Sequence, residues 1–323
     1  MKAILFTKYG SPDVLQVTEV EKPTPKDHQV LVRVHAASAN PLDWHHMRGT
    51  PFLVRLGDGF LKPKDPKLGA DVAGVVEAIG SNVTEFKPGD EVFGVCSGSF
   101  AEYAVAAESK LALKPANLSF EAAAAVPVAA FTALQGLRDK GQIRAGEKVL
   151  INGASGGVGS FAVQIAKSFG AEVTGVCSTP KLDMVRSIGA DHVVDYTRED
   201  FTRNGHHYDL VYDAVGNRSV FDYMRALSPQ GKCVIAGFTG LPRLFEHMIL
   251  GRRMSKPEGK QIVGQGMAAT PKTDLLIIKE LLEAGTVVPV IDKCYPLDKT
   301  AEAVRYLERG HARGKVVITM GNP

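Results

Sequence analysis

Short apolar runs alternating with polar residues dominate the first third of the chain. Residues 30–34 (VLVRV), 72–79 (VAGVVEAI) and 91–95 (EVFGV) are rich in β-branched side chains and are bounded by Pro, Gly or Asp, as strands are. The turn sequence KPGD at residues 87–90 precedes the third run, and residues 98–103 (GSFAEY) begin a further strand. This pattern predicts a compact, mostly antiparallel β domain.

The pattern changes near Ser119. Ser119 is followed by Glu121 and an alanine-rich run, which indicates a helix N-terminus, and residues 131–138 continue with helical spacing. Strands and helices then alternate, as a doubly wound parallel sheet requires, and we expect that sheet to be buried on both faces. The predicted strands are residues 148–152, 172–177, 192–194, 210–213, 233–237 and 261–264.

The C-terminal part returns to β structure. Residues 274–283 and 296–307 have helical spacing of apolar positions, and residues 315–319 form a last strand. A strand after these helices indicates that the tail packs back on the first domain. The predicted organisation is a β domain at residues 1–122, a parallel-sheet domain at residues 123–268 and a returning segment at residues 269–323.

Composition excludes several classes of protein. A net charge of +3 spread over 38 basic and 35 acidic residues predicts no nucleic-acid partner. No apolar run approaches the roughly 20 residues of a membrane-spanning helix, and the start MKAILFTKYG lacks a secretory signal, so we expect a cytoplasmic protein. The four cysteines form no C-x-x-C pair, which argues against disulfides and a structural zinc.

One segment fits neither a clean helix nor a tight loop. Residues 241–260 (LPRLFEHMILGRRMSKPEGK) mix bulky apolar side chains with several basic ones. One interpretation is a long surface excursion that covers the mouth of an active site. The other is a lid, or a peripheral contact with an anionic membrane surface, where basic amphipathic segments lie.

The strongest local motif is KVLINGASGGVGS at residues 148–160. An apolar strand leads into Ala154-x-Gly156-x-x-Gly159 and then into a helix that begins near Val158. Small residues permit a tight turn and a close approach of pyrophosphate, and the helix N-terminus favours the anion. The next strand follows at the length of a βαβ unit. The motif therefore predicts dinucleotide binding; the alternative is a plain glycine-rich turn.

The end of the second strand of this unit indicates which dinucleotide binds. NAD sites usually place Asp or Glu there, whereas this chain has Cys177-Ser178-Thr179-Pro180-Lys181, with no carboxylate to repel a 2′-phosphate. Ser178 can donate a hydrogen bond and Lys181 supplies a positive charge. We expect NADPH as cofactor; the alternative for Lys181 is a solvated lysine at a helix start.

Over nearly its whole length the chain resembles the medium-chain dehydrogenase/reductases, in their quinone oxidoreductase branch. The matching motifs are SPDVL, ANPLDW, GADVAGVVEAIGSNVTEFKPGDEVFG, GSFAEYAV, AAAVPVAAFTALQGL, GASGGVGSFAVQIAK, GADHVVDY, YDLVYDAVG and GHARGKVVI. The resemblance implies an α/β fold, with a mostly β, GroES-like catalytic domain and a Rossmann-like NADPH-binding domain. It also implies a homodimer that pairs residues 261–264 across a twofold axis.

Zinc-dependent relatives place a Cys, a His and a further Cys around their metal. The corresponding stretches here read Asn40-Pro41, Ala70-Asp71 and VPVAAF, and the cysteine-rich lobe expected after Val95 is absent, so we expect a metal-free enzyme. His45 and His46 are adjacent and have no third ligand nearby in sequence. We expect one of them to face solvent and the other to line the substrate cleft.

The resemblance implies an activity that suits a metal-free site. Its members reduce quinones or α,β-unsaturated carbonyls with NADPH, and such substrates delocalise the charge of an added hydride without a Lewis acid. Two alternatives stay open. One is a reductase of another reactive carbonyl, and the other is a non-catalytic NADPH-binding sensor or structural protein.

The resemblance also assigns roles to single residues. The pyrophosphate loop is Ala154, Ser155, Gly156, Gly157, Val158 and Gly159; the 2′-phosphate site is Ser178, Lys181 and Tyr196; other cofactor contacts are Thr132, Gly237, Phe238, Thr239, Arg313 and Lys315; and the catalytic candidates are Asn40, Asp43 and His45. Asn40 could instead cap a turn before Pro41, and Asp43 could pair with Arg48. No residue stands out as a general acid, so we expect solvent to deliver the proton.

Overall fold

The computed structural model describes residues 1–52, 54–240, 242, 243, 245–247, 249 and 259–321. The chain forms two compact units. Unit 1 contains residues Met1–Ala129, Thr270–Ala284 and Pro289–Pro323, and unit 2 contains Ala130–Ala269 and Gly285–Val288. The predicted boundary after residue 122 lies inside a helix of unit 1, Phe120–Ala124.

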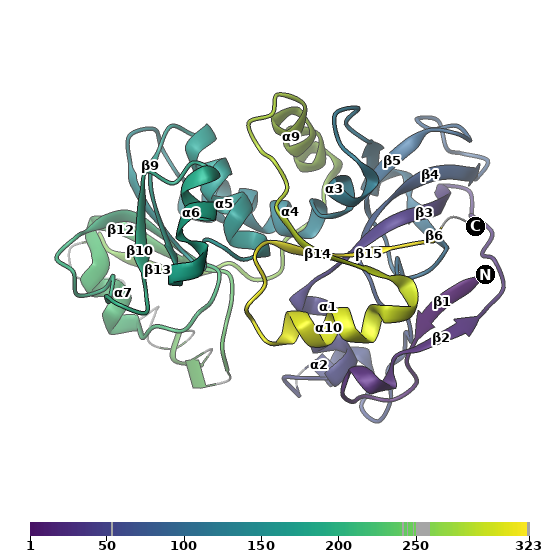
Figure 1. Cartoon of the computed structure of the whole chain (residues 1–323), viewed down its shortest axis with the longest axis horizontal. Helices are drawn as coiled ribbons and strands as arrows, with labels where there is room; N and C mark the ends of the chain where they lie inside the picture. Colours follow the sequence, from purple (N-terminus) through teal and green to yellow (C-terminus); the bar gives the residue numbers. More distant parts are fainter. Residues whose placement is uncertain (53, 241, 244, 248, 250–258, 322–323) are drawn as a thin grey trace. The chain divides into compact units, whose positions relative to one another are not determined.

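Unit 1 is built on a seven-stranded sheet, drawn in purple, blue and yellow in Figure 1. The strand order is β14-β15-β3-β4-β5-β7, and β6 also pairs with β3. The C-terminal strand β15 pairs antiparallel with β3 and parallel with β14. The strands are β3 (Gln29–Ala39), β4 (Asp71–Ile79), β5 (Glu91–Val95), β6 (Tyr103–Ala107), β7 (Leu111–Leu113), β14 (Ile291–Pro296) and β15 (Lys315–Thr319), with β1 (Lys2–Leu5) and β2 (Gln16–Glu19) in a separate two-stranded sheet.

The helices of unit 1 have ends that the sequence explains. Ser119 is the predicted N-cap of α3, and its Oγ accepts a hydrogen bond from the Ala122 N–H at 3.2 Å. Pro41 begins α1, and Gly49 ends it in the left-handed conformation. The helices are α1 (Pro41–Arg48), α2 (Val54–Asp58), α3 (Phe120–Ala124), α9 (Lys272–Glu283) and α10 (Thr300–Glu308), with short 3₁₀ turns at Pro12–Val14, Glu108–Lys110 and Leu297–Lys299.

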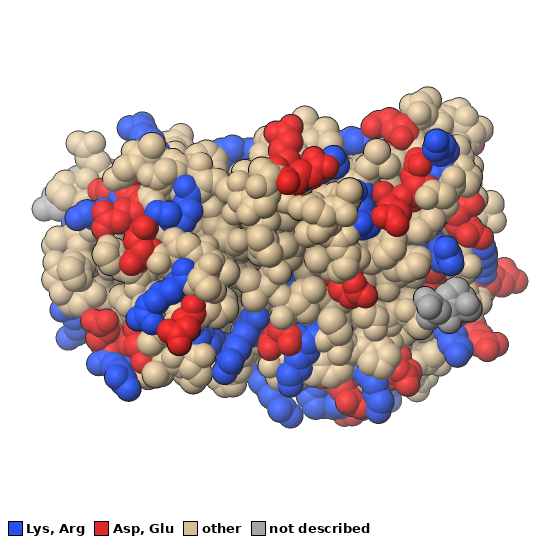
Figure 2. Space-filling view, turned by 45° about the horizontal axis from the view of Figure 1, so that its top comes forward, with Lys and Arg blue, Asp and Glu red and all other residues tan. Residues whose placement is uncertain are grey.

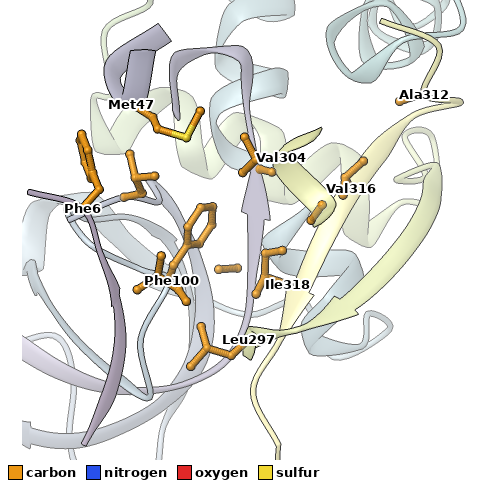
Figure 3. Packing of buried hydrophobic residues seen from close by; sticks show 13 residues of the cluster. Phe6, Met47, Phe100, Leu297, Val304, Ala312, Val316 and Ile318 are labelled. Carbon is orange, nitrogen blue, oxygen red and sulfur yellow. The ribbon is translucent and has the colours of Figure 1, made fainter. Parts of the chain in front are cut away.

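A buried apolar cluster of unit 1 fixes strand β15. Figure 3 shows Val316 and Ile318 of this strand beside Val304 of α10, with Met47 of α1 and Phe100 in the same cluster. Successive side chains of a strand point to opposite faces of the sheet. Lys315 therefore points away from this cluster.

Unit 2 is a six-stranded parallel sheet in the order β10-β9-β8-β11-β12-β13. This is the order of a Rossmann fold, whose switch point lies between β8 and β11, so the predicted fold class is confirmed. The strands are β8 (Lys148–Asn152), β9 (Glu172–Cys177), β10 (His192–Asp195), β11 (Tyr208–Asp213), β12 (Leu227–Ile235) and β13 (Gln261–Gly264). The helices are α4 (Pro127–Gln135), which begins in unit 1, α5 (Gly157–Ser168), α6 (Leu182–Ser187) and α7 (Val220–Ala226), with a π-helical turn at Gly136–Gly141 and a 3₁₀ turn at Thr179–Lys181.

Several strands differ from the sequence predictions. β1, β2 and β7 were not predicted, and β3 continues to Ala39, beyond the predicted residue 34. β12 and β14 show the reason most clearly. β12 begins at Leu227, well before the predicted residue 233. The sequence pattern missed the first half of this strand (LSPQGK) because it is polar and contains Pro and Gly. β14 (IDKCYP) was not predicted, because its side chains are half-buried or exposed and do not alternate. β14 is held by its pairing with β15. The first half of β12 is paired with β11 only at its ends, with Leu227 opposite Tyr208 and Lys232 opposite Leu210.

Basic and acidic side chains are interspersed on the face shown in Figure 2. Among the residues that the structure describes, no helix is both long and apolar enough to cross a bilayer. In the segment 241–260, the described residues 242, 243, 245–247 and 249 are helical, although the sequence pattern fitted no clean helix. Most of the rest of that segment lies outside the described residues, so a lid or a membrane contact stays a prediction.

Candidate functional site

The predicted dinucleotide motif forms a strand, a turn and a helix in unit 2. After β8, the N–H groups of Gly153 and Ala154 both donate to the Val176 carbonyl, at 3.2 and 3.0 Å. Helix α5 then starts at Gly157, and the Ser160 N–H donates to the Gly156 carbonyl at 2.9 Å. The N–H groups of the first helical residues, Gly157, Val158 and Gly159, are the ones that a helix leaves without internal partners. They form an electropositive cradle suited to pyrophosphate.

The glycines of this cradle have different roles. A Cβ on Gly159 would lie 2.0 Å from the Gly153 carbonyl oxygen, so only glycine lets α5 pack against the turn. A Cβ on Gly156 would meet that same oxygen at 3.4 Å, an ordinary contact distance. Within the protein alone, Gly159 is therefore required for packing, and Gly156 keeps space open above the cradle.

The three residues predicted for the 2′-phosphate lie near the carboxyl ends of β9 and β10. The Tyr196 N–H donates to the Cys177 carbonyl at 3.1 Å, and the Tyr196 side chain is 50% exposed. Ser178 follows Cys177 directly, and the Lys181 N–H donates to the Ser178 carbonyl at 2.9 Å. The fold thus brings the backbone of Ser178, Lys181 and Tyr196 to one edge of the sheet, and their role toward a 2′-phosphate stays a prediction.

The expectation that no carboxylate lies here was wrong. Asp195 ends β10 opposite Cys177 in the strand register, far from the 177–181 segment in sequence. Its carboxylate accepts a hydrogen bond from Thr179 Oγ1 and two from Thr197, and Arg198 Nε lies 3.6 Å away. The Thr179 hydrogen bond is the main cause that lowers the pKa of Asp195. Hydrogen bonds from protein groups therefore stabilise the charged form of the Asp195 carboxylate. The sequence did not predict that Asp195 lies near residues 177–181, because the pairing of β10 with β9 places it there.

A buried carboxylate that was not among the predicted site residues organises the switch point. Asp213 ends β11 and is fully buried. Its Oδ1 accepts hydrogen bonds from Asn152 Nδ2 at 3.0 Å, Val215 N–H at 2.7 Å and Gly216 N–H at 2.8 Å, and its Oδ2 accepts one from the Tyr223 hydroxyl. With its acceptors engaged, Asp213 serves to fix the turn that follows β11.

The predicted segment from Gly237 to Thr239 packs on that turn. A Cβ on Gly237 would lie 2.3 Å from the Ala214 carbonyl oxygen, and Thr239 Oγ1 donates to the Gly216 carbonyl at 3.2 Å. Phe238, which lies between Gly237 and Thr239 in the sequence, is half-buried. The carbonyl of Thr132, also predicted to contact the cofactor, accepts a hydrogen bond from the Tyr212 hydroxyl at 3.1 Å.

In unit 1, four polar side chains meet at one end of three adjacent strands; we call Ser38, Asn40, Asp71 and Lys315 the buried polar cluster. Lys315 Nζ donates to Asn40 Oδ1 at 2.5 Å and pairs with Asp71 Oδ2 at 3.2 Å. Asn40 Nδ2 and Ser38 Oγ donate to the same carboxylate oxygen, at 2.8 and 2.5 Å. The side chains of Lys315 and Asp71 are only 3% and 0% exposed.

Asp71 was missed as a site residue, although a signal was present: it is the one charged residue that begins the apolar strand DVAGVV. Its second oxygen accepts a hydrogen bond from the Val128 N–H at 2.8 Å. Lys315 was predicted to contact the cofactor, which stays a prediction; within the protein its ammonium contacts Asn40 and Asp71. Arg313, two residues earlier, is exposed, and its N–H donates to Asp292 at 2.9 Å.

Asp43 anchors the first turn of α1 beneath this cluster. Its two oxygens accept hydrogen bonds from the Asn40 N–H at 2.7 Å and the Gly69 N–H at 3.0 Å. Burial raises the pKa of Asp43 to about 6. Arg48, the alternative partner, pairs with Glu308. Asn40 does occupy the N-cap position before Pro41, as the capping interpretation expected.

The two adjacent histidines contact protein groups. His45 stacks on Trp44 with ring centroids 3.6 Å apart, and its Nδ1 lies 2.7 Å from the Thr50 carbonyl oxygen. Burial lowers the pKa of His45 below its usual 6.5. His46 pairs with Asp58. At neutral pH His45 is therefore mostly uncharged, so the protonated ring that could donate a proton is scarce.

Comparisons with known proteins identify the family. A zinc-binding dehydrogenase model matches residues 188–318, and an alcohol dehydrogenase GroES-like domain model matches residues 26–116. A quinone oxidoreductase of Sus scrofa is 35% identical over 99% of this chain and 98% of its own. A chloroplastic NADPH-dependent alkenal/one oxidoreductase of Arabidopsis thaliana is 37% identical over 98% of this chain and 79% of its own. The chain belongs to the quinone oxidoreductase branch of the medium-chain dehydrogenase/reductases. It is an oxidoreductase.

A solved structure supports the same fold. A protein described as an NAD-dependent alcohol dehydrogenase superposes with a TM-score of 0.85 and 33% identity over 99% of this chain and 100% of its own. The predicted GroES-like domain and parallel-sheet domain are thus confirmed.

The name of the matching dehydrogenase model raises the question of zinc. Tetrahedral zinc needs several Cys, His or carboxylate ligands. Among the described residues, no three His, Cys, Asp or Glu side chains gather in a way that could hold a metal ion. At the stretches matched to zinc ligands, Asn40 carries an amide that contacts the Lys315 ammonium, and Ala70 carries no ligand atom. These residues do not fit zinc.

Proposed function

We propose that this enzyme is a zinc-independent, NADPH-dependent reductase that transfers a hydride to a quinone or an α,β-unsaturated carbonyl. The observation that carries the proposal is the composition of the buried polar cluster. Its positive charge is the Lys315 ammonium, and its other members are an amide, a hydroxyl and one carboxylate. These four side chains cannot polarise a ketone as strongly as a metal Lewis acid does. The substrate must therefore be one that can delocalise the negative charge of the added hydride without a metal.

The choice of NADPH rests on the groups beside the cradle. Lys181 offers a cation, and Ser178 and Tyr196 offer hydroxyl donors, to a 2′-phosphate. Asp195, the one carboxylate brought close by β10, is engaged by threonine donors and lies near Arg198. A structural relative is described as NAD-dependent, so these side chains, rather than the fold, support the preference for NADPH. When bound, the dihydronicotinamide supplies the hydride.

The substrate class follows from charge. A hydride added to a quinone or to the β-carbon of an enone leaves its negative charge on a carbonyl oxygen, where a hydrogen-bond donor or water suffices to stabilise it. One proton from solvent then completes the hydroquinone or the saturated carbonyl. Two relatives bear names that specify quinones and alkenals or enones.

The three catalytic candidates from the sequence act, in this proposal, as positioning residues. Both side-chain polar atoms of Asn40 are engaged inside the cluster, and both carboxylate oxygens of Asp43 hold backbone N–H groups. The lowered pKa of His45 reduces the fraction of its side chain that is protonated near pH 7, so it seldom carries a proton to donate. Solvent is therefore the proposed source of the proton.

Stopped-flow oxidation of bound NADPH tests the proposal. We expect rapid oxidation by benzoquinones, naphthoquinones or alkenals, with no loss of rate after treatment with a chelator. Oxidation by reactive aldehydes alone would favour a reductase of another carbonyl class. Tight NADPH binding without oxidation by any acceptor would indicate a non-catalytic NADPH-binding protein.

We also propose that the enzyme forms a homodimer through β13. This strand pairs with β12 and is the last strand in the order of the described sheet. The resemblance to the family implies that the end strand of this sheet pairs with the same strand of a second chain. Light scattering should show a dimer at micromolar concentration, and a monomer would contradict this part of the proposal.

A further inference from the structure

We propose that Arg198 is a specificity-determining residue for NADPH, because its guanidinium neutralises the Asp195 carboxylate beside the turn that follows β9. Neither residue was among the predicted cofactor contacts. The inference rests on the proposed function, since it takes Ser178, Lys181 and Tyr196 as the residues that meet the 2′-phosphate. It gives a reason why such a site can contain a carboxylate and still accept a phosphorylated nucleotide.

The first step is the position of the Asp195 carboxylate. Asp195 ends β10 opposite Cys177, the last residue of β9, and its side chain is only 9% exposed. The Thr179 hydroxyl donates a hydrogen bond to this carboxylate. Thr179 belongs to the 3₁₀ turn that begins after Ser178 and ends at Lys181. The carboxylate therefore contacts the turn that carries two of the three residues predicted for the 2′-phosphate.

The second step is that this carboxylate stays ionised. The hydrogen bond from Thr179 is the main cause that lowers the pKa of Asp195, and hydrogen bonds from Thr197 and the charge of Arg198 add to it. Hydroxyl and amide donors are neutral, so they orient the carboxylate but leave its negative charge in place. A phosphate bound nearby would be repelled by this charge unless a cation balances it.

The third step is the place of Arg198. Arg198 follows Asp195 by three residues in a turn, and its N–H donates to the Asp195 carbonyl at 3.0 Å. Its Nε lies 3.6 Å from Asp195 Oδ2, while its side chain is 76% exposed. A guanidinium has five N–H donors in a planar fork. Contact with the carboxylate through Nε therefore leaves donors for a second anion that arrives from solvent.

The charges at this edge of the sheet explain why Arg198 should affect one nucleotide and not the other. NADH carries only ribose hydroxyls where NADPH carries a phosphate with about two negative charges. With Arg198, the cations Lys181 and Arg198 outweigh the Asp195 carboxylate; without it, Lys181 and Asp195 balance each other. Arg186, another cation of α6, already pairs with Asp183 at 2.9 Å.

Fluorescence titration with NADPH and NADH tests the inference. Arg198→Ala should weaken NADPH binding by about 5-fold, the upper end for an exposed ion pair, and leave NADH binding unchanged. Arg198→Lys keeps the charge and should keep most of the NADPH affinity. Asp195→Asn/Arg198→Ala should bind NADPH more tightly than Arg198→Ala does, because no carboxylate remains to be neutralised.

Arg203→Ala is the matched control. Arg203 also follows an aspartate by three residues, its Nε lies 3.9 Å from Asp200 Oδ2, and its side chain is 69% exposed. Asp200 likewise accepts hydrogen bonds from a threonine, Thr202, at 2.8 and 3.0 Å. This pair lies in the chain after β10 rather than at the end of the strand. Arg203→Ala should therefore leave both affinities unchanged.

Ionic strength separates an electrostatic role of Arg198 from a structural one. Because salt screens exposed charges, the ratio of NADPH to NADH affinity should fall as salt is added, and it should fall less steeply for Arg198→Ala than for the unmodified enzyme. A residue that only supports the turn would weaken both nucleotides when it is removed and would leave the salt dependence of the ratio unchanged.

The outcomes distinguish this inference from the proposed function. If the unmodified enzyme prefers NADPH, and Arg198→Ala keeps that preference or loses affinity for both nucleotides equally, the inference is wrong and the proposed cofactor stands. Failure of the Asp195→Asn/Arg198→Ala variant to exceed Arg198→Ala would also overturn it. If the unmodified enzyme shows no preference for NADPH, the proposed cofactor is wrong and the inference is wrong with it.

Discussion

The phosphate cradle of unit 2 and the buried polar cluster of unit 1 are built in opposite ways. The cradle comes from one continuous stretch, residues 148–160, and presents backbone N–H groups. The cluster joins Ser38 and Asn40 to Asp71 and to Lys315, which lies on the last strand of the chain, and uses side chains throughout. A backbone site depends on small residues that keep space open, whereas a side-chain cluster depends on the exact balance of its charges.

The difference predicts which substitutions destabilise each region. The cradle should be destabilised when a side chain is added to one of its glycines, and the buried polar cluster should be destabilised when one of its side chains is removed. The following substitutions test this contrast, from the largest expected effect to the smallest.

Asp71→Ala should be the most damaging single change. It leaves the Lys315 ammonium buried without a carboxylate and removes the acceptor of Asn40 and Ser38. Breaking a buried ion pair in this way costs about 3–5 kcal/mol of unfolding free energy. Urea unfolding measures the loss. Glu302→Ala is the control, since Glu302 and its partner Lys299 are 53% and 52% exposed and such a surface pair is worth at most about 1 kcal/mol; equal losses would refute the contrast.

The stability of the wild type relative to Asp43→Asn should depend on pH. Burial raises the pKa of Asp43 from 3.8 to about 6 in the folded state, so the folded protein holds this proton more tightly than the unfolded chain does. The resulting stabilisation is complete below about pH 4 and is lost as pH rises through about 6, by roughly 3 kcal/mol. Urea unfolding of both proteins between pH 4 and 7 checks the sign. A difference that stays constant or grows with pH would contradict the burial argument.

Gly159→Ala should damage the cradle far more than Gly156→Ala does. Its added methyl group would lie 2.0 Å from the Gly153 carbonyl oxygen, whereas the methyl group of Gly156→Ala would have 3.4 Å. Overpacking of this kind costs about 1–3 kcal/mol, with a smaller effect expected for Gly156→Ala. Chemical denaturation of the cofactor-free variants gives the comparison. Matching losses would show that close helix packing does not explain the glycine at position 159.

Lys181→Ala should weaken NADPH binding by about 10- to 100-fold and leave NADH binding nearly unchanged, because only NADPH carries the 2′-phosphate that a charge-assisted hydrogen bond would hold. Fluorescence titration with both nucleotides measures the two affinities. Lys279→Ala, which removes a lysine on α9 paired with Glu283, controls for net charge. A parallel loss for both nucleotides would remove Lys181 from the 2′-phosphate site.

Sequence reasoning located the elements around the cofactor well, because their signals are local. β8, β9 and β13 have the predicted bounds, and the Ser119 cap forms the predicted hydrogen bond. Sequence reasoning failed where the pairing of distant strands determines which residues form a strand or lie close together. β14 has no alternating pattern of its own, and Asp195 reaches the 177–181 segment only through the pairing of β10 with β9.

The amino-acid sequence by itself determined the strand, turn and helix that make the cradle, since neighbouring residues specify the turn and the helix start with little help from elsewhere. The tertiary structure alone decided that Lys315 meets Asn40 and Asp71. That meeting depends on the register of β15 against β3 and of β3 against β4. A shift of one residue would turn each side chain to the other face of the sheet, and no local pattern encodes which distant strand supplies the charge.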